Sequence, residues 1–154
     1  MEKLERSQKL HGENIDIDKI INEIINEIIK GVNPLIEHND TVSQIEQVFR
    51  KYGFYTTKEY PIFRIQNGSG RAGRIDLVAR KGKFRVAVEY DHHQVIKWKS
   101  FQKIVQIKPD VAIGITGSGS IKPNFDRAMK YKDKGKAPLY IISLKERRYE
   151  LIIA

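Results

Sequence analysis

The spacing of apolar residues changes at Gly53, and this change limits the folds open to the chain. Before Gly53, apolar side chains recur every three or four residues, which is the period of an amphipathic helix. After Gly53, they alternate with polar side chains, which is the period of a strand with one buried face. Later segments alternate between the two patterns. This order predicts an α/β domain with a mixed central sheet flanked by helices.

The first helix is expected over residues 17–29, where seven isoleucines fall on one helical face. Gly31 and Pro34 terminate it, as a glycine followed by a proline usually does. So broad an apolar stripe either packs on the chain's own domain or pairs with its copy in a second subunit. We interpret residues 1–33 as an N-terminal helical extension and residues 34–154 as the main domain.

The later segments alternate between strand and helix. A second helix is expected to begin at Asp40 or Thr41, either of which can cap the first turn. Lys81-Gly82 forms a two-residue turn, so that the first three strands make an antiparallel meander. The expected strands are residues 60–65, 75–79, 84–91, 111–116, 139–144 and 149–153, and the further helices are 97–108 and 124–134.

Composition excludes several classes of protein. The chain has no cysteine, which excludes disulfides, zinc-thiolate sites, iron–sulfur clusters and cysteine nucleophiles. No stretch reaches the roughly 18 consecutive apolar residues of a membrane helix. The first ten residues carry charges where a secretory signal has its apolar core. We expect a soluble cytoplasmic protein without membrane contact, whose chemistry comes from carboxylates, histidine, lysine or hydroxyls.

Charge is distributed unevenly along the 154 residues. The formal net charge is +9, but residues 71–154 carry a net +11 and residues 1–30 a net −2. A basic surface attracts nucleic acid by neutralising phosphates and releasing counterions, although some basic surfaces serve solubility alone. The charge pattern favours nucleic acid as the partner of the second half of the chain.

Three carboxylates are predicted to lie on one face of the meander. Glu89 and Asp91 share a face of the third strand because side chains alternate across a strand. With the turn given above, Asp76 faces Ala87 and lies diagonal to Glu89, about 7–8 Å away. Hard divalent cations bind through one or two carboxylates and take water or phosphate oxygens as further ligands. The pattern predicts a Mg²⁺ or Mn²⁺ site on a basic surface.

The segments that contain these acids resemble the motifs of a known family. GRIDLVA at 73–79, a short turn and RVAVEYD at 85–91 follow a helix that contains Glu46. Over residues 40 to 116, the chain resembles the PD-(D/E)XK nuclease superfamily, with a layout similar to archaeal Holliday-junction resolvases. The resemblance implies a restriction-endonuclease-like core and a divalent-metal-dependent endonuclease that hydrolyses DNA phosphodiester bonds. Branched or otherwise structured DNA is among the substrates that it implies.

The resemblance also implies roles for the acids. Asp76 and Glu89 match the two acids of the family, which would hold the metal together with the carbonyl of Tyr90. Glu46 could reach the same site from its helix and is a further catalytic candidate. The alternative for Glu46 is an ordinary solvated position on the helix.

Asp91 departs from the pattern, because the family carries a lysine at this position. Asp91 can bind metal or act as a general base, but it cannot supply positive charge. Some relatives carry a carboxylate here and still cut, and some supply the lysine from the following helix, where Lys97, Lys99 and Lys103 are available. Others have lost catalysis, so the alternative function is a catalytically inactive nucleic-acid-binding protein of the same fold.

DNA-contacting side chains are expected around the acids and on the following helix. They are Arg71, Arg74, His93, Gln94, Lys97, Lys99 and Lys103. A homodimer through the isoleucine helix is also expected. Seven isoleucines exceed what a peripheral helix readily buries, and an enzyme similar to a resolvase needs two sites for two strands. Twofold pairing is the commonest oligomeric arrangement.

Overall fold

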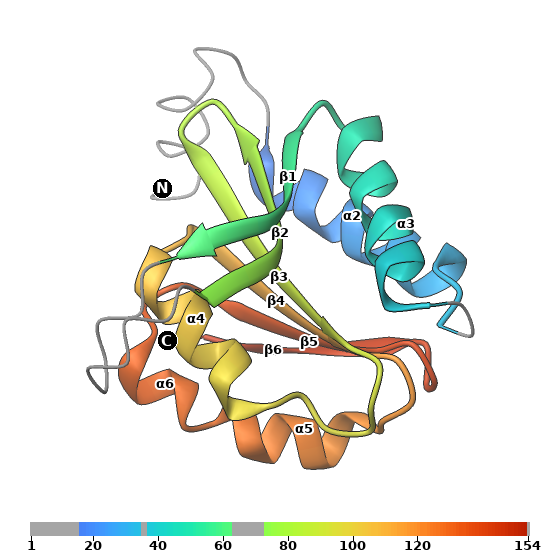
Figure 1. Cartoon of the computed structure of the whole chain (residues 1–154), viewed down its shortest axis with the longest axis vertical. Coiled ribbons are helices and arrows are strands. Elements are labelled where there is room, and N and C mark those ends of the chain that lie inside the picture. The colour runs from blue at the N-terminus through green and yellow to red at the C-terminus, as the bar shows by residue number, and fades with distance from the viewer. Residues whose placement is uncertain (1–15, 35–36, 63–72, 154) are drawn as a thin grey trace.

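The computed structural model describes residues 16–34, 37–62 and 73–153, in which six strands form one sheet in chain order (Figure 1). Strands β1 to β3 pair antiparallel, β3 to β5 pair parallel, and β6 returns antiparallel to β5. The prediction of an α/β fold with a mixed sheet is confirmed. The strands are β1 (Tyr55–Ile62), β2 (Gly73–Lys81), β3 (Phe84–Asp91), β4 (Val111–Thr116), β5 (Leu139–Ser143) and β6 (Arg148–Ile152).

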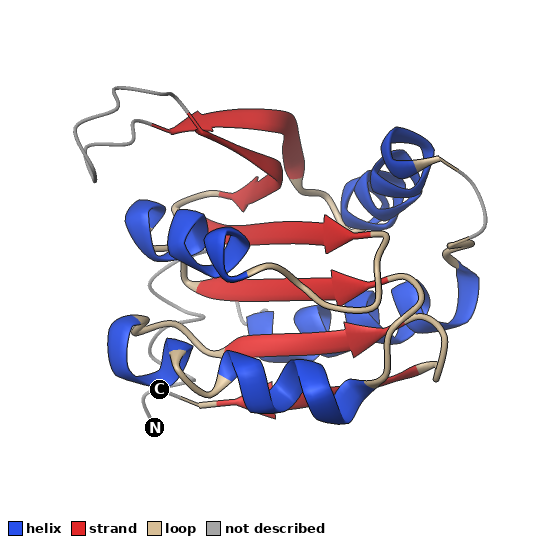
Figure 2. Cartoon of the chain, turned by 60° about the horizontal axis from the view of Figure 1, so that its bottom comes forward, coloured by secondary structure: helices blue, strands red, loops and turns tan. Residues whose placement is uncertain are grey.

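Helices cover both faces of the sheet (Figure 2). One face is covered by α2 (Ile17–Gly31) and α3 (His38–Lys51). The other is covered by α4 (Trp98–Ile107), α5 (Ile121–Ala128) and the short α6 (Tyr131–Lys134). Strand β4 is consequently buried along its whole length and reads as a continuous apolar run. No helix in the described part of the chain is long and apolar enough to cross a membrane.

Helix α2 belongs to the core of this domain. Asp16 caps its first turn, where the carboxylate accepts hydrogen bonds from the backbone N–H groups of Asp18 and Lys19. The isoleucines at 17, 21, 24, 25 and 28 are at most 1% exposed and belong to the same apolar core as β3, β4 and β5. The division at residue 33 does not appear in the packing. The predicted homodimer stays a prediction, but it loses the free apolar face on which it rested.

Several element boundaries differ from the sequence-based ones. Strand β1 begins at Tyr55 rather than near residue 60. The sequence pattern did not indicate its first half, because that half is mostly exposed and shows no apolar alternation. Helix α3 begins at His38, two or three residues before the predicted caps. The helix predicted over residues 124–134 is divided into α5 and α6, and α5 begins earlier, with Pro123 in its first turn, where proline is tolerated.

The turn between β2 and β3 also differs from the prediction. Lys81 pairs with Phe84, so the two-residue turn is Gly82-Lys83 and not Lys81-Gly82. Gly82 has a φ of 61°, a conformation that glycine adopts without steric cost. This turn changes the register, so that the regular pairing ends with Leu77 opposite Val88. The same register, continued by one residue, places Asp76 directly opposite Glu89 rather than diagonal to it.

Candidate functional site

Strands β2 and β3 separate at the two acids. Regular pairing ends at Leu77 and Val88. Beyond these residues, backbone N–H groups donate to side-chain carboxylates instead of to backbone carbonyls of the neighbouring strand. The backbone N–H of Asp76 donates to Glu89 Oε2 at 2.8 Å, and the backbone N–H of Tyr90 donates to Asp76 Oδ2 at 2.8 Å. The two carboxylates are thereby held side by side in the gap between the strands, with geometry set by the backbone.

The β1–β2 hairpin bends at the same place. Leu77 belongs to the core under α2 and α3, whereas Ile75 belongs to the core under α4, so the alternation of β2 breaks at Asp76. By register, Glu59 of β1 lies opposite Asp76, and its φ is 51°. Residues other than glycine adopt this conformation rarely, and such strain concentrates at functional sites. Figure 1 shows the bend in β1.

Glu89 is a buried carboxyl with a lysine beside it. The residue is 2% exposed, and Lys103 Nζ of α4 lies 2.6 Å from Glu89 Oε1. Lys103 is fixed in turn by donating to the carbonyl of Arg74 at 2.7 Å. Burial, followed by the charge of Asp76, raises the pKa of Glu89 to about 7, and Lys103 acts in the opposite direction. The site therefore combines two acids with one lysine, which contacts Glu89 directly.

His38 approaches the acids from the other side of the sheet. It is the first residue of α3, and its Nε2 lies 3.0 Å from the carbonyl oxygen of Tyr90 and 3.5 Å from Asp76 Oδ2. Asp76 and His38 also line one open hollow together with Asn39, Val42, Lys58 and Glu59. The side chains of His38 and Asp76 are 43% and 22% exposed. Solvent and ligands thus reach Asp76 from this hollow.

Two predicted acids lie apart from this pair. Asp91 Oδ1 accepts a hydrogen bond from the backbone N–H of His93 at 3.0 Å, which ties it to its own turn. Glu46 is buried, and its Oε2 accepts from Thr56 Oγ1 at 2.8 Å and lies 3.5 Å from Arg50. Glu46 lies eight residues along α3 from His38, a rise of about 12 Å. It therefore faces the start of β1, near Thr56, and not the acid pair.

The expected cluster of three carboxylates does not form. In the described ranges there is no group of three or more histidine, cysteine, aspartate and glutamate side chains that could hold a metal ion. The oxygen donors that lie together are instead Asp76, Glu89 and the carbonyl of Tyr90. Two carboxylates and a carbonyl suit a hard divalent cation that keeps water among its ligands. This donor set fits Mg²⁺ or Mn²⁺.

A second open hollow follows the end of β3. It is lined by His93, Gln94, Val95, Lys97, Ser118 and Arg127. The loop beneath it is held by side chains: Thr116 Oγ1 donates to the carbonyl of His93 at 2.7 Å, and Asn124 Nδ2 to the carbonyl of Gln94 at 2.9 Å. The hollow is therefore a fixed surface with two exposed cations and no carboxylate in its lining.

The other predicted DNA contacts are distributed more widely. Arg74 is exposed and lies 3.6 Å from Glu59. Lys99 is exposed on α4, whereas Lys103 points to Glu89. Arg71 lies outside the described residues.

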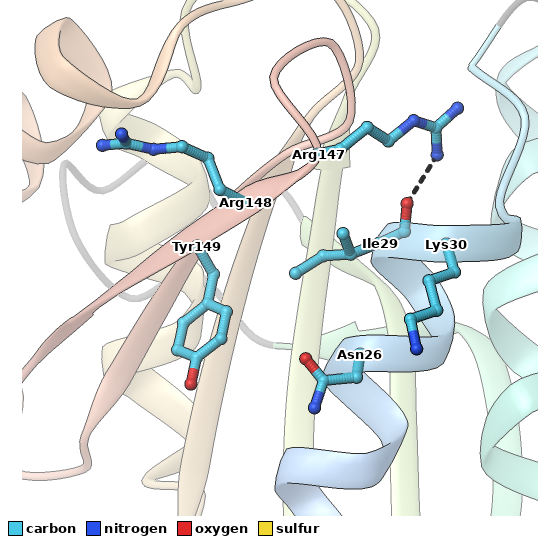
Figure 3. Close-up of a pocket in the computed structure, with 6 residues that line it drawn as sticks. All are labelled: Asn26, Ile29, Lys30, Arg147, Arg148 and Tyr149. Atoms are coloured by element: carbon cyan, nitrogen blue, oxygen red, sulfur yellow. Dashed lines mark hydrogen bonds between the residues drawn. The ribbon is translucent and has the colours of Figure 1, made fainter.

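A third hollow lies between α2 and β6, and neither acid of the pair lines it (Figure 3). It is lined by Asn26, Ile29, Lys30, Arg147, Arg148 and Tyr149. Arg147 Nη1 donates to the carbonyls of Ile29 and Val32 at 2.8 and 2.9 Å. These carbonyls end helix α2, so Arg147 has a structural role as a cap.

Comparison with known proteins leaves the function open. No family model and no curated protein matches the chain. Among solved structures, it is similar to the crystal structure of a protein of unknown function, AF1548. The sequence identity is 11% and the TM-score is 0.46, and the match covers 68% of this chain and 57% of that one.

Three residues of these sites had weak signals in the sequence. His38 fell outside the predicted helix, so nothing indicated that it would face the acids. Arg127 was expected on a helix but had no link to the end of β3. Lys103 was one of three candidate lysines on the helix predicted over residues 97–108, and only the packing of α4 on β2 selects it.

Proposed function

We propose that the protein is a divalent-metal-dependent endonuclease with a restriction-endonuclease-like core that hydrolyses DNA phosphodiester bonds. The observation that carries this proposal is the contact of Asp76, Glu89 and Lys103 where β2 and β3 separate. The resemblance to PD-(D/E)XK nucleases calls for two acids and a lysine, and the sequence has Asp91 at the lysine position. Lys103 of the following helix supplies a cation to the same carboxylates.

The order of elements supports the same proposal. Helix α3, strands β1 to β3, helix α4 and strand β4 follow one another between residues 38 and 116. This is the segment over which the sequence resembles the nuclease superfamily, and the acids lie on its second and third strands.

In this proposal, Asp76, Glu89 and the carbonyl of Tyr90 hold the metal. The bound Mg²⁺ or Mn²⁺ supplies an activated water and stabilises charge that develops on the phosphate. Lys103 compensates part of the negative charge of Glu89 and offers a donor to a phosphate oxygen in the transition state. Asp91 is bound to its own turn and has a structural role in this proposal.

The basic hollow after β3 is the proposed path of the DNA backbone. Lys97 and Arg127 line it, and β3 leads from Glu89 directly to its rim. Phosphate contacts of this kind position the duplex without reading its sequence. His93 and Gln94 lie on the same rim as further polar contacts.

The deciding experiment is a cleavage assay on linear, nicked, flapped and four-way-junction DNA. With Mg²⁺ or Mn²⁺ we expect strand cleavage, and with EDTA none. Asp76→Asn should bind DNA as well as the wild type and cut none of the substrates, because it loses a metal ligand and a charge that repels phosphate. DNA binding by the wild type without cleavage in either metal would overturn the proposal and favour the inactive nucleic-acid-binding protein.

Salt dependence tests the proposed backbone path. Each cation that neutralises a phosphate contributes a slope of about 0.9 to the plot of log affinity against log salt. Lys97→Ala and Arg127→Ala should each lower the slope by about 1 in fluorescence anisotropy titrations. Lys19→Ala, on the exposed side of α2, is the matched control and should leave the slope unchanged. Equal slopes for all four proteins would place the DNA elsewhere.

A further inference from the structure

We propose that the pocket between α4 and α6 binds a phosphate group of a nucleic acid strand. Its lining contains three lysines, Lys108, Lys134 and Lys136, together with Tyr131 and Gly135, and it contains no acid. None of these residues takes part in the proposed nuclease site. The inference therefore goes beyond that function and does not depend on it.

The pocket belongs to the more basic of the two helical layers. Residues 97–136, which contain α4, β4, α5 and α6, carry ten lysines and arginines and three acids, a net +7. Residues 16–51, which contain α2 and α3, carry four and seven, a net −3. A polyanion is therefore attracted to the side of α4 to α6, where its phosphates release counterions as they meet lysines.

The lysines of the pocket have no acidic partner. Within the described ranges, no ion pair joins Lys108, Lys134 or Lys136 to a carboxylate. Lys134 Nζ lies 5.6 Å from the centroid of the Trp98 ring, a weak contact for an exposed side chain. A lysine carries three donors on a flexible stem, so all three ammonium groups can turn to one anion.

Lys108 occupies a backbone position that usually belongs to glycine. It ends α4 in the left-handed conformation, with a φ of 49°. A side chain is accommodated there at a steric cost, and the side chain of Lys108 lines the pocket. Strained positions of this kind concentrate at functional sites.

Arg85 compensates the negative end of α4. The last turn of this helix lines the pocket, and its free carbonyls would repel an anion. Arg85 Nη2 donates to the carbonyls of Ile107 and Lys108 from the start of β3. The lysines of the pocket are therefore not needed to cap the helix, and their charge stays available to a ligand.

The hydroxyl of Tyr131 is a donor directed into the pocket. Tyr131 is 1% exposed, and its hydroxyl has no hydrogen-bond partner among the described residues. The hydroxyl is not fully buried, since Gln106 Oε1 is the only such side-chain atom without a partner in the same part of the chain. The phenol end lies against Gly135, where a Cβ would be 2.2 Å from Tyr131 Cζ. The hydroxyl therefore opens on the pocket.

A ligand oxygen would complete the bonding of this hydroxyl. Buried polar groups in folded proteins nearly always have a hydrogen-bond partner. Burial raises the pKa of Tyr131 to about 12, so the hydroxyl keeps its proton and donates. A phosphate oxygen is an acceptor of this kind, and the surrounding lysines supply the opposite charge.

The pocket has the size of a phosphate group rather than of a nucleotide. Its volume is about 160 Å³. Pockets that enclose a whole small molecule have roughly 300–1,000 Å³. One phosphate would enter the pocket, and the rest of the strand would remain outside, on the exposed lysines of the same layer.

The first test titrates the full chain with sodium phosphate, and with sodium chloride at equal ionic strength, and follows the backbone amides by nuclear magnetic resonance. The Gly135 amide should shift with phosphate and not with chloride. Tyr131→Phe, which removes only the hydroxyl, should weaken phosphate binding by about three- to tenfold. Lys108→Gly should weaken it to a similar extent without strain, because glycine suits the left-handed conformation. Lys122→Ala, exposed on α5, removes one charge from the same layer outside the pocket and should bind phosphate as the wild type does.

Thermal unfolding separates ligand binding from a structural role. Without phosphate, Tyr131→Phe should unfold at nearly the same temperature as the wild type, because the hydroxyl has no partner in the described residues. With phosphate, the wild type should gain more stability than the variant, because a ligand of the folded state stabilises it in proportion to its occupancy. Equal phosphate binding by the wild type, Tyr131→Phe and Lys108→Gly would overturn the site.

A DNA titration in EDTA identifies the source of the phosphate. A short duplex without terminal phosphates should shift the same amides, and Tyr131→Phe should weaken its binding by a similar factor. Phosphate binding that the duplex does not reproduce would overturn the nucleic acid strand as the source and assign the pocket to a free phosphate ligand. Both negative results leave the nuclease proposal standing, because cleavage is assigned to Asp76 and Glu89.

Discussion

Cleavage of DNA is expected to fall by roughly 10²–10³-fold when Lys103 is replaced by methionine. Lys103 Nζ lies 2.6 Å from Glu89 Oε1 and is the cation nearest the acid pair on the α4 side. Methionine keeps the length of the side chain and removes the charge. Circular dichroism and DNA affinity should stay close to those of the wild type, so the loss would belong to the chemical step in single-turnover assays.

Placing a lysine at residue 91, where the nucleases that the sequence resembles carry one, gives a sharper version of this prediction. Residues 89 and 91 share a face of β3, so a lysine at 91 emerges beside Glu89. In Lys103→Met, the added change Asp91→Lys should recover a large part of the lost rate. Asp91→Ala in the same background is the matched control and should recover none. An unchanged rate in Lys103→Met would show that Lys103 only neutralises Glu89.

The stability of the metal-free protein is expected to fall as the pH rises from about 4.5 to about 7. Burial raises the pKa of Glu89 from 4.5 to about 7 in the folded state, so the folded chain keeps a proton that the unfolded chain releases. The folded state therefore binds more protons in this window. At 1.36 kcal/mol per pH unit, the loss amounts to about 3 kcal/mol, and it levels off above pH 7.

Glu89→Gln removes this titration and isolates its effect. Urea unfolding in EDTA should give similar stabilities for the two proteins below pH 4.5 and a variant more stable than the wild type by about 3 kcal/mol at pH 8. Glu150→Gln, at an exposed position on β6, is the control and should follow the wild type. A wild type that matches Glu89→Gln at pH 8 would mean that the ion pair with Lys103 fully offsets the cost of burying the carboxylate.

Local patterns in the sequence determined most of the sheet and part of the site. The alternation in residues 84–91 predicted β3 with its observed bounds, and the apolar run 111–116 predicted β4. The presence of Glu89 and Asp91 on one face follows from the two-residue period of a strand. These features depend on neighbours along the chain, which is why the sequence alone predicts them.

The tertiary structure decided the partners of these residues. The isoleucines of α2 were open to two uses, and the extent of the sheet face decided that the chain buries them itself. The turn at Gly82-Lys83 shifted the register of β2 on β3 and placed Asp76 opposite Glu89.

Two residues that lie against these acids, Lys103 and His38, also depend on packing over long sequence separations. Lys103 is 14 residues from Glu89, and His38 is 38 residues from Asp76. Each reaches its acid because a helix crosses the sheet where β2 and β3 separate. Helical and strand periods state which face a residue occupies, but not which position of a distant element that face meets, because that depends on how whole elements pack.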